Sequence, residues 1–152
     1  MQQGRGISRD VGYSVRRSGR QVHRVEGGEP IASSLGKNRD LFARRLGAVG
    51  ICGGHGLFEP GASLPCHFHG FDESITIIAG TAVCQVAGRE YDLSGYDTAC
   101  IPRGRPHRFL NRSDRPMAMI WVYAGDEPDR VLVDPGYCEG RLDLATMPGA
   151  LP

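Results

Sequence analysis

The stretch CHFHGFDESITIIAG, residues 66–80, places His67, His69 and Glu73 inside a run that has the pattern of a β-strand. Side chains of one parity share one face of a strand, so these three side chains should point the same way. The Cys66 side chain should then point the other way and is not a natural fourth ligand. The pattern therefore predicts a single polar face that could hold a metal ion.

The composition of the chain favours strands over helices. Its 152 residues are the size of one ordinary domain, which can bury a core without disulfides. There are 22 glycines and 10 prolines, and the apolar runs are short and end at turn residues. This spacing predicts an all-β sandwich or barrel, with no helix longer than about three turns.

The strand pattern also suggests how the chain is divided. Residues 81–93 have the pattern of two strands hinged at Ala87, Gly88 and Arg89. Residues 117–125, MAMIWVYAG, are apolar at both parities, so we expect this strand to be buried on both faces. We expect an N-terminal arm and leading strands in residues 1–44, a barrel core in residues 45–125 and a C-terminal tail in residues 126–152.

Charge is distributed unevenly along the chain. Residues 1–45 carry ten basic and four acidic groups, net +6, whereas residues 46–152 have a net charge of −5. A basic arm could contact nucleic acid, but no DNA- or RNA-binding motif accompanies it, so we expect no nucleic-acid partner. The preferred alternative is contact with the acidic barrel of its own or a partner subunit. The sequence has no signal-peptide core and no long apolar run, so we expect a cytoplasmic protein without a membrane partner.

The five cysteines, at positions 52, 66, 84, 100 and 138, form no CxxC pair. An odd number cannot all pair within one chain, so we expect buried free thiols instead of disulfides. A closed structural zinc site would more often use cysteines, and none of them lies at ligand spacing.

A second histidine cluster lies in PRGRPHRFLN, residues 102–111. Pro102 and Gly104 predict a tight corner just before His107, which would turn a returning strand so that its imidazole faces the first cluster. Three neutral imidazoles and one carboxylate suit a divalent transition metal, and they leave coordination positions open for water, substrate or dioxygen.

Other polar residues allow weaker interpretations. His55 is most simply a strand histidine, with pocket lining as the alternative. Three arginines beside the second cluster could clamp a substrate carboxylate, although surface positions are the preferred explanation in a chain so rich in arginine: Arg103, Arg105 and Arg108. Trp121 and Tyr123 are expected in the core. No catalytic residue is assigned, and three residues are candidates for a general base by type alone: Gln85, Tyr91 and Tyr123.

The two clusters together resemble the motifs of the cupin superfamily. The first motif is a glycine, five residues, HxH, three or four residues, Glu, six residues and Gly, and it is matched by Gly61, His67, His69, Glu73 and Gly80. The second motif is matched by Pro102, Gly104, His107 and Asn111. It differs at its start, because Tyr96 occupies the expected glycine position and Gly95 precedes it. The resemblance covers about residues 45–125.

The resemblance implies a cupin-like double-stranded β-helix, or jelly-roll barrel. It implies that one divalent transition ion, iron, manganese, nickel or zinc, is bound by His67, His69, Glu73 and His107. It also implies a homodimer, for which the apolar strand and the charged arm offer surface.

Two functions stay open, because the superfamily includes dioxygenases, isomerases, decarboxylases, epimerases and binding domains. The first is a mononuclear metalloenzyme of oxygenase, isomerase or decarboxylase type, which acts on a small polar or carboxylate-bearing metabolite. The second is a non-enzymatic module that uses a metal ion to bind or sense a small molecule.

Overall fold

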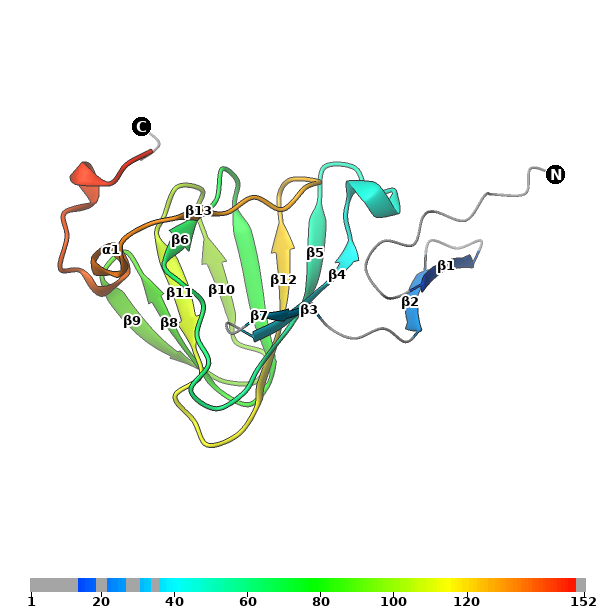
Figure 1. Cartoon of the computed structure of the whole chain (residues 1–152), viewed down its shortest axis with the longest axis horizontal. Coiled ribbons are helices and arrows are strands. Elements are labelled where there is room, and N and C mark those ends of the chain that lie inside the picture. The colour runs from blue at the N-terminus through cyan, green and yellow to red at the C-terminus, as the bar shows by residue number, and fades with distance from the viewer. Residues whose placement is uncertain (1–13, 19–21, 27–30, 34–35, 150–152) are drawn as a thin grey trace.

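Two antiparallel sheets that face each other make up most of the molecule (Figure 1). The computed structural model describes residues 14–18, 22–26, 31–33 and 36–149. The only α-helix in these ranges is α1, Pro135–Glu139, which has five residues. The prediction of an all-β jelly-roll barrel with short helices is therefore confirmed for the described chain.

The first sheet has six strands, with β12 and β5 at its centre. Their order across the sheet is β10 (Thr98–Ile101), β7 (Glu73–Ala79), β12 (Met117–Tyr123), β5 (Cys52–Phe58), β4 (Gly36–Phe42) and β3 (Ile31–Ser33). Strand β12 has its inward side chains buried, but Ile120 and Val122 on the outer face are only half-buried. The expectation that this strand is buried on both faces is wrong for these two residues, because no second layer covers them in the described chain.

The second sheet has five strands and faces the first. Their order is β13 (Val131–Leu132), β6 (His67–Phe68), β11 (His107–Leu110), β8 (Ala82–Val86) and β9 (Arg89–Leu93). The β8–β9 hairpin turns through Ala87 and Gly88, whose φ angles are 46° and 83°. Two successive positive φ values match the twist of a two-residue hairpin, so the predicted hinge is confirmed.

The apolar core fills one end of the space between the sheets. Phe58, Ile77, Phe109 and Met117 are fully buried there. The register pairs Met117 with Phe58 at this end of β12 and pairs Tyr123 with Glu73 at the other end. The barrel is therefore closed by apolar packing at one end and carries its polar residues at the opposite end.

The N-terminal strands lie at one side of the barrel. Strands β1 (Ser14–Ser18) and β2 (Val22–Glu26) pair with each other and lie beyond β4 in Figure 1. Strands β3 and β4 instead extend the six-stranded sheet. The division of the chain at residues 44 and 125 and the homodimer stay predictions. None of the helices in the described part of the chain is long and apolar enough to cross a membrane.

A disulfide joins Cys66 to Cys138, 72 residues apart. The expectation of free thiols throughout is therefore wrong for these two cysteines, although Cys52 and Cys84 are buried and free and Cys100 is exposed and free. Cys66 and Phe68 face away from the space between the sheets, and α1 packs against them. The α1 helix is fixed there by Asp134, whose Oδ1 accepts a hydrogen bond from the Gly136 amide at 2.7 Å.

Candidate metal site

The first histidine motif is divided between the two sheets. His67 lies in β6 of the five-stranded sheet, whereas Glu73 begins β7 of the six-stranded sheet. His69 lies in the segment that crosses between them. The expectation that one regular strand carries all three side chains is therefore wrong. The backbone leaves the β conformation after Phe68 because it must change sheets, and alternation cannot aim side chains across such a crossing.

The corner before His107 holds this crossing segment in place. The Arg105 amide donates to Pro102 O at 3.2 Å, and Gly104 has a φ of 74°, which confirms the predicted turn. The Gly104 amide donates to His69 O at 2.8 Å. The Arg103 amide donates to Asp72 Oδ1 at 2.9 Å. The corner therefore orients His107 and supports the segment that carries His69.

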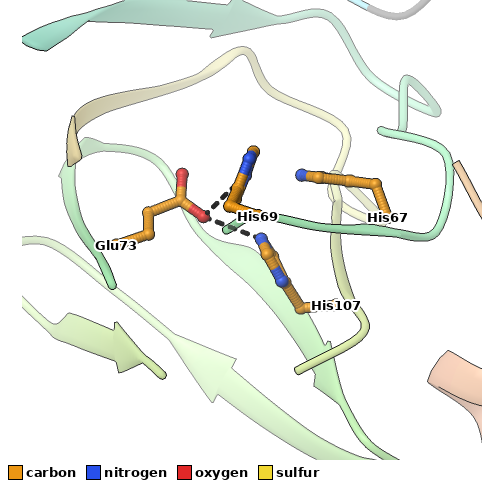
Figure 2. Close-up of side chains that lie close together, drawn as sticks. All are labelled: His67, His69, Glu73 and His107. Carbon is orange, nitrogen blue, oxygen red and sulfur yellow. Dashed lines mark ion pairs between the residues drawn. The ribbon is translucent and has the colours of Figure 1, made fainter. Parts of the chain in front are cut away.

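The four residues predicted to bind metal converge in the polar end of the barrel. His67 lies directly opposite His107 in the β6–β11 pair. Each of the four side chains offers one ligand atom, and these atoms lie within 4.8 Å of one another. Figure 2 shows the three imidazole rings and the Glu73 carboxylate pointing toward one another. All four residues are at most 4% exposed: His67, His69, Glu73 and His107.

Backbone carbonyls fix the orientation and the tautomer of each imidazole. His67 Nδ1 lies 2.7 Å from Pro65 O, and His107 Nδ1 lies 2.8 Å from Arg105 O. His69 Nδ1 contacts Asp129 O in the same way. Because a carbonyl oxygen only accepts, each Nδ1 must carry the hydrogen. The Nε2 atom of each ring is left with its lone pair available to a ligand.

The lone pairs meet around the Glu73 carboxylate. Glu73 Oε2 lies 2.7 Å from His107 Nε2 and 3.3 Å from His69 Nε2. These three buried atoms have no hydrogen-bond partner among the described residues. Acceptor atoms at such distances repel one another unless a cation lies between them, and a proton or a metal ion can take that position. The nitrogen and oxygen donors, each imidazole held through its other nitrogen, fit a divalent transition ion.

Burial and mutual contact set the pKa values of the cluster. Burial lowers the pKa of His67 to about 2, so this ring is neutral. Burial disfavours the charged form of Glu73, but the close imidazoles of His107 and His69 outweigh it and lower the pKa of Glu73 to about 2. Burial also opposes charge on His69, yet Glu73 and Asp129 raise the pKa of this imidazole. The cluster therefore holds an ionised carboxylate next to rings that can bind a cation.

A cavity of about 310 Å³ lies against Glu73. Its walls combine apolar side chains with charged and polar ones: Leu64, Met119, Trp121, Tyr123, Asn38, Asp40, Asp129 and Arg130. Trp121 and Tyr123 are core residues, as expected, and they also line this cavity. Burial and the nearby Glu73 raise the pKa of Tyr123, and Arg130 opposes this shift. The phenol therefore stays protonated at neutral pH and can donate a hydrogen bond.

Several residues considered from the sequence lie elsewhere. His55 is half-buried and pairs with Ile120, on the outer face of the six-stranded sheet. Gln85 Nε2 donates to Glu90, and Gln85 Oε1 accepts from Arg108, so Gln85 is engaged away from the cluster. Neither His55 nor Gln85 lines the cavity beside Glu73.

Tyr91 and the three arginines also lie away from this cavity. Arg108 forms an ion pair with Glu139 at 2.6 Å, which supports a structural position. Arg103 is exposed in the corner, and Tyr91 and Arg105 line a different cavity. None of the four side chains is placed to clamp a substrate beside Glu73.

Sequence reasoning missed two residues next to the cluster, Asp129 and Arg130. Asp129 contacts His69 through its backbone and lies with its Oδ1 atom 3.1 Å from His69 Nδ1, and its Oδ2 accepts from the Gly70 amide at 3.1 Å. Arg130 lines the cavity beside Tyr123. Both residues follow the last strand of the motif region, sixty positions from His69, and no local pattern indicates this contact.

Residues 54–123 match the family model described as the Cupin domain. A curated relative, the tetracenomycin polyketide synthase protein TcmJ of Streptomyces glaucescens, is 32% identical over 82 residues, which are 53% of this chain and 55% of that protein. The chain thus matches about half the length of this relative.

Solved structures show the same fold. An oxalate decarboxylase of Bacillus subtilis, studied for its Mn(II) centres, has a TM-score of 0.64 and 24% identity, and the match covers 69% of this chain and 30% of that one. The polyketide cyclase RemF of Streptomyces resistomycificus has a TM-score of 0.59 and 24% identity, covering 66% of this chain and 72% of that one. At this identity the two structures establish a likeness of fold alone.

Proposed function

Because residues 54–123 match the Cupin domain, we propose that the chain is a member of the cupin superfamily and that it binds one divalent transition metal ion through His67, His69, Glu73 and His107. The observation that supports this most strongly is the set of three buried acceptor atoms without hydrogen-bond partners, on His69, Glu73 and His107. Iron, manganese, nickel and zinc all accept this mixture of imidazole nitrogen and carboxylate oxygen.

We propose further that the protein is a metalloenzyme for a small polar or carboxylate-bearing molecule that enters the cavity beside Glu73. A bound ion would supply Lewis acidity or redox chemistry. Arg130 can attract a carboxylate, and the protonated Tyr123 can donate a hydrogen bond to a substrate oxygen. The indole of Trp121 gives the cavity an apolar wall against which a short carbon chain can lie.

A second candidate is a non-enzymatic module that binds or senses a small molecule. The side chains around the cavity that could act as a general base are already held by other groups or stay protonated, which favours this candidate. The carboxylate of Asp129 is held by His69 and Gly70, and that of Asp40 forms an ion pair with Arg45 at 2.6 Å. Tyr123 stays protonated at neutral pH. A reaction that needs a protein base would therefore have to break one of these interactions.

Elemental analysis of protein purified without a chelator and without a nickel column tests the metal proposal. We expect about one equivalent of a divalent transition ion per chain, retained or restored by titration. His107→Ala should lower metal content and melting temperature, because it removes a ligand from a strand far from the first motif. If wild type takes up no stoichiometric ion, or if His107→Ala binds it equally well, the proposal is wrong.

The metal-loaded protein can then distinguish the two functions. Small mono- and dicarboxylates should raise its melting temperature if they bind in the cavity. Product formation from any of them, monitored by nuclear magnetic resonance in air and under nitrogen, supports the enzyme. A carboxylate that stabilises the protein without turnover supports the binding module. Whether or not turnover occurs, Trp121→Ala should reduce the rise in melting temperature that carboxylates cause. This replacement removes a wall of the cavity without removing an atom that could bind the metal ion.

A further inference from the structure

A second cavity of about 570 Å³ lies between the free edges of the two sheets. Strands β9 and β10 are consecutive in the chain but belong to different sheets, and each is the outermost strand of its sheet. None of the four cluster residues lines this second cavity, although two of its lining residues, Val86 and Ile101, pair with His107 and Glu73 in the sheets. The barrel therefore has an opening along one side that the proposed metal site does not use.

The lining of this second cavity is mostly apolar surface that is left uncovered. The inner faces of β9 and β10 contribute Leu93, Ala99 and Ile101, and Tyr91 stands among them with 47% of its surface exposed. Burial raises the pKa of the Cys84 thiol at its floor to about 12, so this group is neutral. Apolar concave surfaces of this size are where proteins bind small molecules.

Two arginines lie at one end of the second cavity. Arg89 pairs with Val86 across the hairpin, Val86 pairs with His107, and Arg105 precedes His107 by two residues. Within the described chain neither guanidinium has a hydrogen bond or an ion pair, and no acidic residue lines the cavity. Positive charge is thus concentrated at one end of a mostly apolar cavity whose lining contains no acidic residue.

We propose that this second cavity binds a small amphiphilic carboxylate, with its carboxylate between Arg89 and Arg105 and its hydrocarbon ring or rings against Tyr91 and Leu93. Charge complementarity selects this occupant over the chain's own N-terminal segment, because residues 1–45 have a net charge of +6 and the arginines would repel them. The volume is in the usual range for an organic ligand of this type. The proposal is independent of the metal and of any reaction beside Glu73.

Binding of 2-naphthoate, with 2-naphthylmethanol as the uncharged probe of the same shape, tests the charge requirement. Naphthoate should bind at least tenfold more tightly than the alcohol, because a charge-assisted hydrogen bond contributes more than a neutral one. Arg89→Gln should weaken naphthoate binding about tenfold and leave the alcohol unchanged. Arg103→Gln is the matched control, since it removes the same charge from an exposed side chain that does not line the second cavity. Equal losses in the two variants, or equal binding of the two probes, would overturn the proposal.

Cys100 reports where the probe sits. It lines the second cavity and is the one exposed free thiol among the five cysteines, all of which the structure describes. Naphthoate should therefore slow its alkylation by iodoacetamide, to the same degree with and without a chelator. Protection that is lost with the chelator would place the ligand at the metal instead. If the probe no longer binds under conditions in which light scattering detects a dimer or larger species, a second copy of the chain occupies the cavity. Either result overturns the proposal.

Discussion

The buried side-chain amide of Asn111 donates through Nδ2 to Phe58 O at 3.0 Å and to Arg115 O at 2.7 Å. Asn111 Oδ1 accepts from the Ser113 amide at 3.0 Å, and Asn111 O accepts from the Gly61 amide at 2.9 Å. One side chain thus joins the end of β5 to the turn that leads from β11 into β12. The last residue of the second motif is therefore architectural and is not part of the proposed metal site.

Asn111→Ala should lower the free energy of unfolding by about 3 kcal/mol, because it removes from a buried side chain its hydrogen bonds to Phe58 O, Arg115 O and the Ser113 amide. Urea unfolding of the metal-free protein measures this change. Ser113→Ala is the control from the same turn and should cost about 1 kcal/mol or less, since Ser113 is only half-buried. The folded Asn111→Ala variant should still take up metal. Unchanged stability, or loss of metal without loss of stability, would contradict the architectural role.

Replacement of both Cys66 and Cys138 by Ser should destabilise the protein substantially. The disulfide closes a loop with a sequence separation of 72 residues. On the chain-entropy model, a loop of this length contributes about 4 kcal/mol, which urea unfolding can detect. Metal content should remain near that of wild type, because Cys66 faces away from the cluster.

A thiol count on denatured protein checks the same bond directly. Without reductant the chain should show three reactive thiols, from Cys52, Cys84 and Cys100. All five cysteines should react after reduction. Five thiols before reduction would show that the two cysteines are not bonded in solution, and the expected loss of stability would then not occur.

Tyr96→Gly should stabilise the protein. Tyr96 has a φ of 70°, and its exposed side chain makes no compensating contact in the core. The turn around it is held by the Tyr96 amide, which donates to Ile77 O at 2.7 Å, and by Asp97 Oδ2, which accepts from the Ser94 amide at 2.8 Å. Glycine adopts this left-handed conformation without the steric cost of about 1 kcal/mol. Tyr96→Ala, which keeps a Cβ atom, should show no such gain in the midpoint of thermal or urea unfolding, and equal stability of the two variants would refute the strain.

Tyr96 also shows what motif comparison can and cannot predict. The sequence places a tyrosine in a glycine position of the second motif, with Gly95 beside it. The structure keeps the left-handed turn at Tyr96, whereas a Cβ atom added at Gly95 would meet nothing within 4 Å. The left-handed conformation is therefore kept at the glycine position of the motif, residue 96, and does not move to Gly95. Hydrogen bonds to β7 fix that position, and these cannot be identified from residue type.

The convergence of His67, His69, Glu73 and His107 was predictable from the two motifs and from the corner before His107, although strand alternation did not account for how the first three are aimed. Three other features depend on contacts between distant segments: the division of the first motif between two sheets, the Cys66–Cys138 disulfide and the contact of Asp129 with His69. The short helix α1 is a different case. Asp134 before Pro135 and Gly140 at the end are capping signals that the sequence does contain, with Gly140 at a φ of 76°. A helix of five residues is too short for apolar periodicity to show, so these signals alone do not predict it.

Asp129 should raise metal affinity by orienting His69. Its carboxylate contacts His69 Nδ1 and the Gly70 amide, so it holds the crossing segment in the position that directs His69 Nε2 at Glu73. Interactions of this kind with the far side of an imidazole change metal affinity by about 10- to 100-fold. Asp129→Ala should lower the affinity toward the lower end of this range, because the Asp129 backbone carbonyl still accepts from His69 Nδ1.

Asp126→Ala is the matched control for this prediction. It removes a carboxylate from the same connection after β12, but Asp126 pairs with Arg44 at 2.7 Å and does not contact His69. Metal titration of the two variants, together with the melting temperatures of their metal-free forms, separates orientation from stability. If Asp129 orients His69, its replacement weakens metal binding while the metal-free melting temperature stays close to that of wild type, because the Asp129 side chain is 46% exposed. Equal metal affinities for the two variants would show that the backbone carbonyl alone is sufficient to hold the ring.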